Sequence, residues 1–185
     1  SLEQSKAVCS IVCAQAARLA EQLGESDRAL SNWQKVLELN ALDIEAHLAS
    51  LRLLESQGRY EELQAALLQQ DDKTVLPQQR RADLVRVAQI QANQLEQPAA
   101  AIQTWQSIRE QFGPAEDCHA ALLKLYQSQE MHGELAALLA DTIESAEPQV
   151  AARLTLLGTT YRDALGDEAR ALSCYRRALA LDPTN

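Results

Sequence analysis

The sequence predicts an all-α protein: an α-solenoid of about five antiparallel helical hairpins in one domain over residues 1–185. Three observations point to this fold, namely a helix-forming composition, an internal duplication, and a recurring spacing near 34 residues between pairs of packing residues. Apolar residues make up 46% of the chain but aromatic residues only 4%. The 6 Gly and 5 Pro are too few for a β architecture, whereas the abundant Ala, Leu, Gln and Glu favour helix.

The charge of the chain restricts its partners. The net charge is −9, from 17 basic and 26 acidic side chains, and this acidity argues against nucleic acid or an anionic membrane as the partner. No apolar run approaches the roughly 18 residues of a membrane helix. The four cysteines lack the spacing of a disulfide framework. We therefore expect free thiols, a cytoplasmic location, and a protein or peptide partner.

Residues 29–67 and 101–139 are two copies of one segment, offset by 72 residues. Aligned without a gap, the copies share 14 identical residues in 39 positions. Trp33 and Trp105 are one of the shared pairs. Because both copies should fold in the same way, the two tryptophans are predicted to be buried in equivalent places, where each fills the gap to the next hairpin.

A shorter period within each copy sets the helical hairpins. A small or apolar residue followed four positions later by a large one recurs at Ala29/Trp33, Leu63/Leu67, Ala101/Trp105, Leu135/Leu139 and Ala171/Tyr175. The steps between these pairs are 34, 38, 34 and 36 residues. Each hairpin is too small to bury its apolar face alone and must stack on its neighbours. The predicted hairpins cover residues 5–39, 43–70, 77–112, 114–145 and 148–181.

Turn residues mark the ends of the predicted helices. Gly24, Gly58 and Gly166 stand between the two helices of a hairpin, where Gly accepts the left-handed conformation that ends a helix. The third and fourth hairpins have Glu96 and Glu130 at this place, so we expect those turns to be built differently. The predicted helices cover residues 5–23, 26–39, 43–57, 60–70, 77–94, 98–112, 114–129, 131–145, 148–164 and 167–181.

The last hairpin carries a recognisable motif. It reads Leu154-x-x-Leu157-Gly158-x-x-Tyr161 on its first helix, followed by Ala171, Tyr175 and Pro183. This pattern resembles the tetratricopeptide repeat, with Leu154 in place of the usual Trp and one residue added between Gly158 and Gly166. The resemblance implies a right-handed superhelix and extends, more weakly, over nearly the whole chain. Because the chain begins and ends inside repeat-like sequence, we expect it to be a segment of a longer repeat protein.

The resemblance implies a protein-interaction scaffold that binds a peptide or helix in a concave groove lined by the first helix of each hairpin. The family's clamp for a C-terminal carboxylate, a Lys and an Asn one turn apart, has no match here. The basic residues predicted to point into the groove are Arg18, Arg52, Arg86 and Lys124, with Ile90 and Thr159 in the same phase. Because arginine grips carboxylates with a planar fork, this basic row could bind an acidic partner.

Simpler interpretations stay open beside each candidate. Neighbouring acids such as Glu21, Glu45 and Glu55 could pair with the basic row as ordinary surface ion pairs. His47 and His119 occupy packing positions and are interpreted as structural, and Cys9 with Cys13 lacks two further metal ligands. We therefore predict no enzyme activity, no metal and no cofactor. The alternatives to peptide binding are an assembly module that self-associates through its open ends and a regulatory domain of a larger protein.

Overall fold

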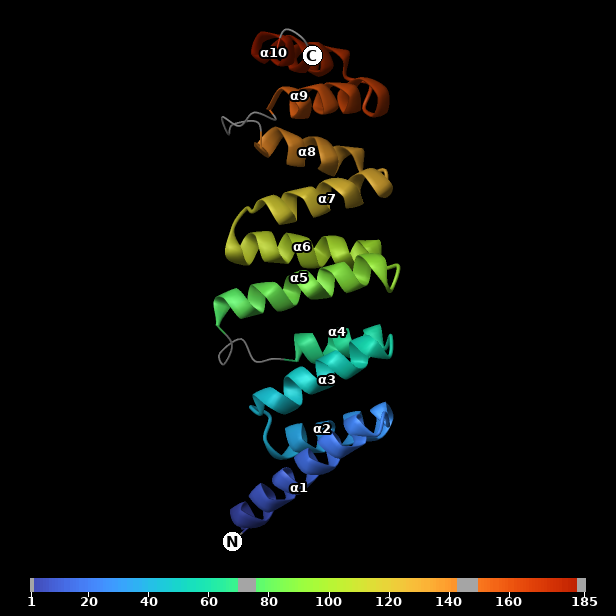
Figure 1. Cartoon of the computed structure of the whole chain (residues 1–185). Coiled ribbons are helices and arrows are strands. Elements are labelled where there is room, and N and C mark those ends of the chain that lie inside the picture. Colours follow the sequence, from blue (N-terminus) through green and yellow to red (C-terminus); the bar gives the residue numbers. More distant parts are fainter. Residues whose placement is uncertain (1, 70–75, 143–149, 183–185) are drawn as a thin grey trace. The chain divides into compact units, whose positions relative to one another are not determined.

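The computed structural model describes residues 2–69, 76–142 and 150–182, which consist of helices joined by short turns and contain no strand (Figure 1). The all-α prediction is therefore confirmed. The chain divides into two compact units, unit 1 over Ser1–Gln97 and unit 2 over Pro98–Asn185. The single domain over residues 1–185 stays a prediction, and the repeat position Pro183 lies outside the described residues.

Unit 1 contains five helices, each of which packs against the next along the chain. They are α1 (Leu2–Gln22), α2 (Ser26–Leu39), α3 (Ile44–Ser56), α4 (Tyr60–Leu68) and α5 (Pro77–Asn93). Asp43 caps α3, since its side chain accepts a hydrogen bond from the backbone N–H of Ala46 at 2.9 Å. Pro77 begins α5 at the one helical position where a missing N–H costs nothing.

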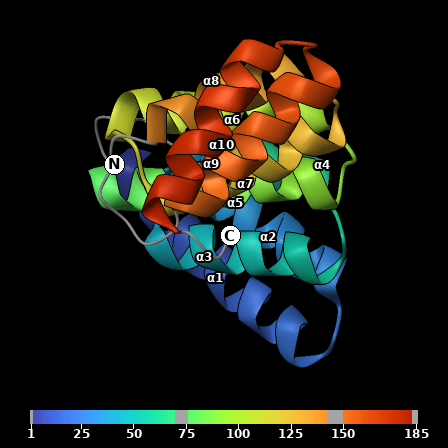
Figure 2. The same ribbon diagram turned by 90° about the horizontal axis from the view of Figure 1, so that it is seen from above.

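Unit 2 follows the same plan, with consecutive helices in contact (Figure 2). Its elements are α6 (Pro98–Phe112), α7 (Glu116–Ser128), α8 (His132–Thr142), α9 (Val150–Thr159), the π-helix η1 (Thr160–Ala164) and α10 (Glu168–Leu181). The helices of both units match the predicted ranges to within a few residues. The predicted helix ends at residues 70, 145 and 148 lie outside the described residues.

The predicted packing residues form the interior of both units. Trp33 is 2% exposed and Trp105 4%, so the prediction that both are buried is confirmed. The residue that precedes each large anchor by four positions is also buried, at Ala29, Leu63, Ala101, Leu135 and Ala171. The two copies of the duplicated segment therefore bury the same kinds of residue at the same places.

The prediction that the turns at Glu96 and Glu130 are built differently is wrong. Both glutamates have φ +53°, in the left-handed region that Gly58 occupies at φ +68°. The backbone of residue 131 donates to Tyr126 O at 2.9 Å, as the backbone of Arg59 does to Leu54 O, so one hydrogen-bonding pattern closes both helices. This pattern holds the glutamates in a conformation that costs a residue with a Cβ about 1–2 kcal/mol.

The tetratricopeptide motif of the last hairpin has a direct packing cause. A Cβ built at Gly158 would lie 2.6 Å from the ring of Tyr175, so the absence of a side chain on α9 lets α10 approach. The residue added before Gly166 falls in the π-helix η1, where the backbone N–H of Leu165 bonds Thr160 O, five residues earlier, at 3.2 Å. A π-turn accommodates one more residue than an α-turn, so the insertion is absorbed locally.

Candidate protein-interaction surface

Ion pairs join the first helices of successive hairpins in unit 1. Arg18 on α1 donates to Glu45 on α3, with 2.7 Å between Nε and Oε1, and this hydrogen bond lowers the pKa of Glu45. The Arg18 guanidinium also lies 5.9 Å from the centroid of the Trp33 ring. Arg18, the first member of the basic row, therefore contacts both an acid of the next hairpin and the edge of the core.

Glu21 connects the buried tryptophan to the second member of the row. One carboxylate oxygen of Glu21 accepts a hydrogen bond from Trp33 Nε1 at 2.7 Å, and the other pairs with Arg52 on α3. Because Trp33 is buried, this bond satisfies an indole N–H that would otherwise lack a partner. Arg52 is itself held over the surface of the α1–α3 pair.

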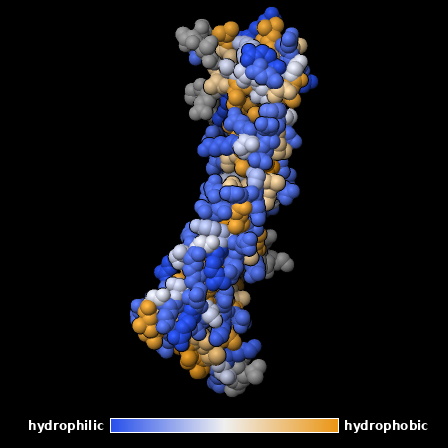
Figure 3. Space-filling view, turned by 90° about the vertical axis from the view of Figure 1, so that its right-hand side faces the viewer, coloured by the Kyte–Doolittle hydropathy of each residue, from blue (hydrophilic) through white to orange (hydrophobic). Residues whose placement is uncertain are grey.

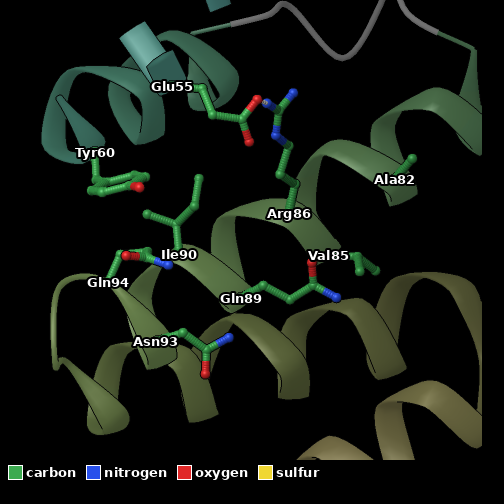
Figure 4. Close-up of a pocket in the computed structure, with 9 residues that line it drawn as sticks. All are labelled: Glu55, Tyr60, Ala82, Val85, Arg86, Gln89, Ile90, Asn93 and Gln94. Atoms are coloured by element: carbon green, nitrogen blue, oxygen red, sulfur yellow. Dashed lines mark hydrogen bonds and ion pairs between the residues drawn. The ribbon is translucent and has the colours of Figure 1, made fainter. Parts of the chain in front are cut away.

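Arg86 on α5 is the third member of the row and pairs with Glu55 on α3, at 2.6 Å between Nη2 and Oε2. Figure 4 shows the Glu55 carboxylate facing the Arg86 guanidinium, with Tyr60 and Ile90 on the neighbouring side. Arg18, Arg52 and Arg86 are therefore all ion-paired within unit 1. The surface ion pairs that the sequence left open as an alternative are present in the structure, and whether these arginines also bind a partner stays a prediction.

A cavity of about 450 Å³ opens beside the Glu55–Arg86 pair. Its wall combines this pair with apolar side chains and three amides, and α5 supplies most of it. The lining residues are Glu55, Tyr60, Ala82, Val85, Arg86, Gln89, Ile90, Asn93 and Gln94. Side-chain amides both donate and accept hydrogen bonds, so this wall can pair with the backbone groups of a peptide.

The phase predicted for α5 is corrected by one turn. Ile90 is only 7% exposed and belongs to the core of unit 1, so it does not present a free side chain to the groove. Arg86, one turn earlier, reaches Glu55 instead. The four-residue excess between the second and third hairpins causes this shift, because it moves α5 by about one turn relative to a constant 34-residue step.

Exposed apolar residues continue this surface along α3. Ile44 is 76% exposed and Leu48 61%, and Arg52 follows one turn later on the same side of the helix. Together with the cavity they offer apolar contact area next to paired charges. We name this region the α3–α5 surface, which consists of Ile44, Leu48, Arg52, Glu55, Arg86 and the cavity wall on α5.

The equivalent part of unit 2 has different chemistry. Lys124 on α7 is exposed and makes no ion pair with any residue that the structure describes. Arg153 on α9 is 9% exposed and lies 3.4 Å from Glu116 on α7. The predicted groove residue Thr159 bonds its own helix, with its hydroxyl donating to Leu156 O at 2.8 Å.

The two histidines are neutral packing residues. Burial lowers the pKa of His47, with Asp83 opposing the shift, and burial followed by the charge of Arg153 lowers the pKa of His119. Both ring nitrogens of His119 are buried without a hydrogen-bond partner among the described residues. In the described ranges no group of three or more His, Cys, Asp or Glu could hold a metal ion, and Cys9 and Cys13 are free thiols.

Sequence reasoning missed most of the cavity wall. Tyr60, Gln89, Asn93 and Gln94 were not among the candidates, although they line the cavity with Arg86. Gln89 and Asn93 stand one helical turn apart, as Val85 and Gln89 do, and this spacing on one face of α5 is the signal that could have found them. None of the helices in the described ranges is long and apolar enough to cross a membrane.

Comparison with known proteins agrees with this architecture. The family model for the tetratricopeptide repeat matches residues 151–185, which include α9 and α10. The crystal structure of YrrB, described as a tetratricopeptide-repeat protein with an unusual peptide-binding site, has 19% identity and a TM-score of 0.50, with 91% of this chain and 84% of that chain covered. No protein of curated function matches the sequence significantly.

Two further solved structures are similar at lower scores. MamA has 16% identity and a TM-score of 0.49, covering 95% of this chain and 92% of that one. The pilF protein of Pseudomonas aeruginosa has 18% identity and a TM-score of 0.42, covering 98% and 95%. The repeat match at residues 151–185, the helical hairpins and the likeness to YrrB show that this chain carries a tetratricopeptide repeat and has the fold of the tetratricopeptide-repeat solenoids.

Proposed function

We propose that the chain is a protein-interaction scaffold and that its α3–α5 surface binds an acidic peptide segment of a partner. The observation that carries this proposal is the Glu55–Arg86 pair at the edge of a cavity lined by amide side chains. The tetratricopeptide fold supports the scaffold role, because helical repeats of this kind stack into extended binding surfaces. YrrB, which has the same fold, is described as containing a peptide-binding site.

The ion pairs explain how an acidic segment can bind. Glu55 is 56% exposed and Glu45 55%, and pairs this open to solvent are worth only about 0–1 kcal/mol. A carboxylate of the partner can therefore replace an internal one at small cost. The arginine fork then offers it two parallel hydrogen bonds, which a lysine cannot do.

The rest of the surface suits the remainder of a peptide. Leu48 and Ile44 offer exposed apolar contacts, and Gln89 with Asn93 offers donors and acceptors to the peptide backbone. An extended strand and a helix are both compatible with this arrangement. Arg18 and Lys124 remain predicted contributors to the same activity.

The proposal is tested by selecting peptides from a random display library on the immobilised chain and measuring their affinity by fluorescence anisotropy. Selected sequences should be acidic, and Arg86→Glu should weaken them about tenfold or more, the effect of losing a charge-assisted hydrogen bond. Arg28→Glu is the matched control, because Arg28 pairs with Glu25 on α2, a second helix outside the proposed surface.

A second variant extends the test to the whole basic row. Arg52→Glu combined with Lys124→Glu should reduce peptide capture while leaving the circular dichroism signal unchanged, since both side chains are exposed. Equal affinity for wild type, Arg86→Glu and the double variant would reject the proposal. Selection of basic or purely apolar peptides would reject it as well.

A further inference from the structure

The first helix of the chain exposes a face that its repeat equivalent buries. Residues of α1 correspond to residues of α3 at an offset of 34, so Val12 corresponds to Ala46 and Leu19 to Leu53. Ala46 is 0% exposed and Leu53 7%, whereas Val12 is 57% exposed and Leu19 56%. Both α1 and α3 pack on the helix that follows them, but α3 also packs on α2, which precedes it. The face that differs is therefore the one that a preceding second helix covers.

This face of α1, called here the leading face, consists of Val8, Val12, Gln15, Ala16, Leu19 and Leu23. All six are exposed and none is charged. Burying them would require no desolvation of an ionised group, which is the main cost of covering a helix surface.

The last helix exposes the complementary face. Residues of α10 correspond to residues of α2 at an offset of 142, which pairs Ala171 with Ala29 and places Leu172 at the position of Leu30. Leu30 is 2% exposed in the core of unit 1, and Ile102, at the same position of α6, is 6% exposed in unit 2. Leu172 is 50% exposed.

Leu179 repeats this difference further along α10. Its equivalent on α2, Leu37, is partly buried against the core of unit 1, whereas Leu179 is 51% exposed. The trailing face, Leu172 with Leu179, is therefore the surface that a following first helix covers elsewhere in the chain. In the space-filling view apolar surface appears on the helices near both termini (Figure 3).

From these two differences we propose that the chain self-associates head to tail, with the trailing face of α10 in one copy packed on the leading face of α1 in the next. The contact repeats the packing of α2 on α3 that already exists within unit 1. A contact between two leading faces or two trailing faces would instead join like halves of that interface, for which the fold offers no precedent. Because the two halves differ, the contact does not close on itself and gives open chains of copies.

The test uses analytical ultracentrifugation of the 185-residue chain and of two double variants. Wild type should form species beyond the dimer as its concentration rises. Val12→Glu with Leu19→Glu destroys only the leading face, and Leu172→Glu with Leu179→Glu destroys only the trailing face, so each variant alone should be monomeric. An equal mixture of the two should form a one-to-one dimer and nothing larger, since one intact face of each kind remains.

Leu48→Glu is the matched control, because Leu48 is at least as exposed as Val12 but lies on neither end face; it should assemble as wild type does. Circular dichroism verifies that the helices persist, and glutamine replaces glutamate at the same positions if an end helix unfolds. A wild type that stays monomeric at the highest concentration overturns the proposal. So does self-association of either double variant, which would indicate a two-fold contact between like faces.

Discussion

The segments at residues 29–67 and 101–139 share an interior and differ at the surface. Trp33 and Trp105 are both buried, and Leu63 and Leu135 are at most 3% exposed. On the surface, Arg52 becomes Lys124 and Glu55 becomes Gln127, so the acid that holds Arg86 in the first copy has no charged counterpart in the second. One copy thus carries part of an ion-paired surface that the other lacks.

The difference follows from the size of the energies involved. A large-to-small change in the core costs about 3–5 kcal/mol for an aromatic residue, whereas a surface ion pair contributes about 0–1 kcal/mol. Packing residues are therefore held fixed after a duplication while surface charges are free to change. This is the reason to look for a binding site where the copies differ rather than where they agree.

The largest expected effect tests the common interior. Trp33→Ala and Trp105→Ala should each lower the free energy of unfolding of their own unit by about 3–5 kcal/mol, because each leaves a cavity where an indole is buried. Urea denaturation followed by circular dichroism measures both losses. A loss below about 1 kcal/mol at one tryptophan would show that the two interiors are not equivalent.

A smaller effect tests the turns that end equivalent helices. Glu130→Gly should stabilise the chain by about 1 kcal/mol, because Gly accepts the positive φ that strains a glutamate. The reciprocal change, Gly58→Glu in the other copy, should destabilise by a similar amount even though the nearest atom to its Cβ, on Tyr60, is 3.8 Å away. Thermal melts of both variants give the comparison, and equal signs would contradict it.

The paired histidines should give the chain a modest sensitivity to acid. Burial lowers the pKa of His47 and His119 below 6.5, so the unfolded chain binds more protons than the folded one as the pH falls through this range. The stability present above about pH 6.5 should therefore decrease below it. Melting temperatures measured from about pH 7 to about pH 5 test this sign.

The two copies should differ in this response. His119→Gln should reduce the acid sensitivity more than His47→Gln, because Arg153 pushes the pKa of His119 further down while Asp83 pushes that of His47 back up. An acid response that is unchanged in His119→Gln would show that other groups dominate it.

The smallest effect concerns the surface charges. Arg52→Gln should cost up to about 1 kcal/mol at low salt, because it breaks the pair with Glu21, and the loss should fade as salt is added. Lys124→Gln should change stability by less, since Lys124 has no ion pair among the described residues. Denaturation at two salt concentrations separates these outcomes, and a salt-dependent loss at Lys124 would break the contrast.

The interior of the fold could be predicted from sequence because burial is periodic. The spacing of Ala29 and Trp33, repeated 72 residues later, is enough to place both helices and both tryptophans. Turn geometry was less accessible, since Glu130 gives no local signal for a left-handed conformation. Backbone hydrogen bonds that close the helix impose it.

The candidate site was predictable only in part. The basic residues stand out by type, and the ion-pair alternative was visible from Glu21 and Glu55 in the sequence. The cavity was not, because its wall depends on the rotation of α5, which places Arg86 rather than Ile90 beside Glu55. A shift of four residues in the spacing between hairpins changes which side chain reaches the surface, and periodicity alone does not resolve it.

Hydrogen exchange with and without a selected acidic peptide tests the central claim most directly, because it reports where the peptide binds. We expect slower exchange in α3, α5 and the turn between α3 and α4, with α7 unchanged although it carries the equivalent Lys124. Arg86→Glu should abolish this protection and Arg28→Glu should preserve it. Protection confined to α7 and α9, or unchanged in Arg86→Glu, would contradict the assignment of the binding surface to α3 and α5.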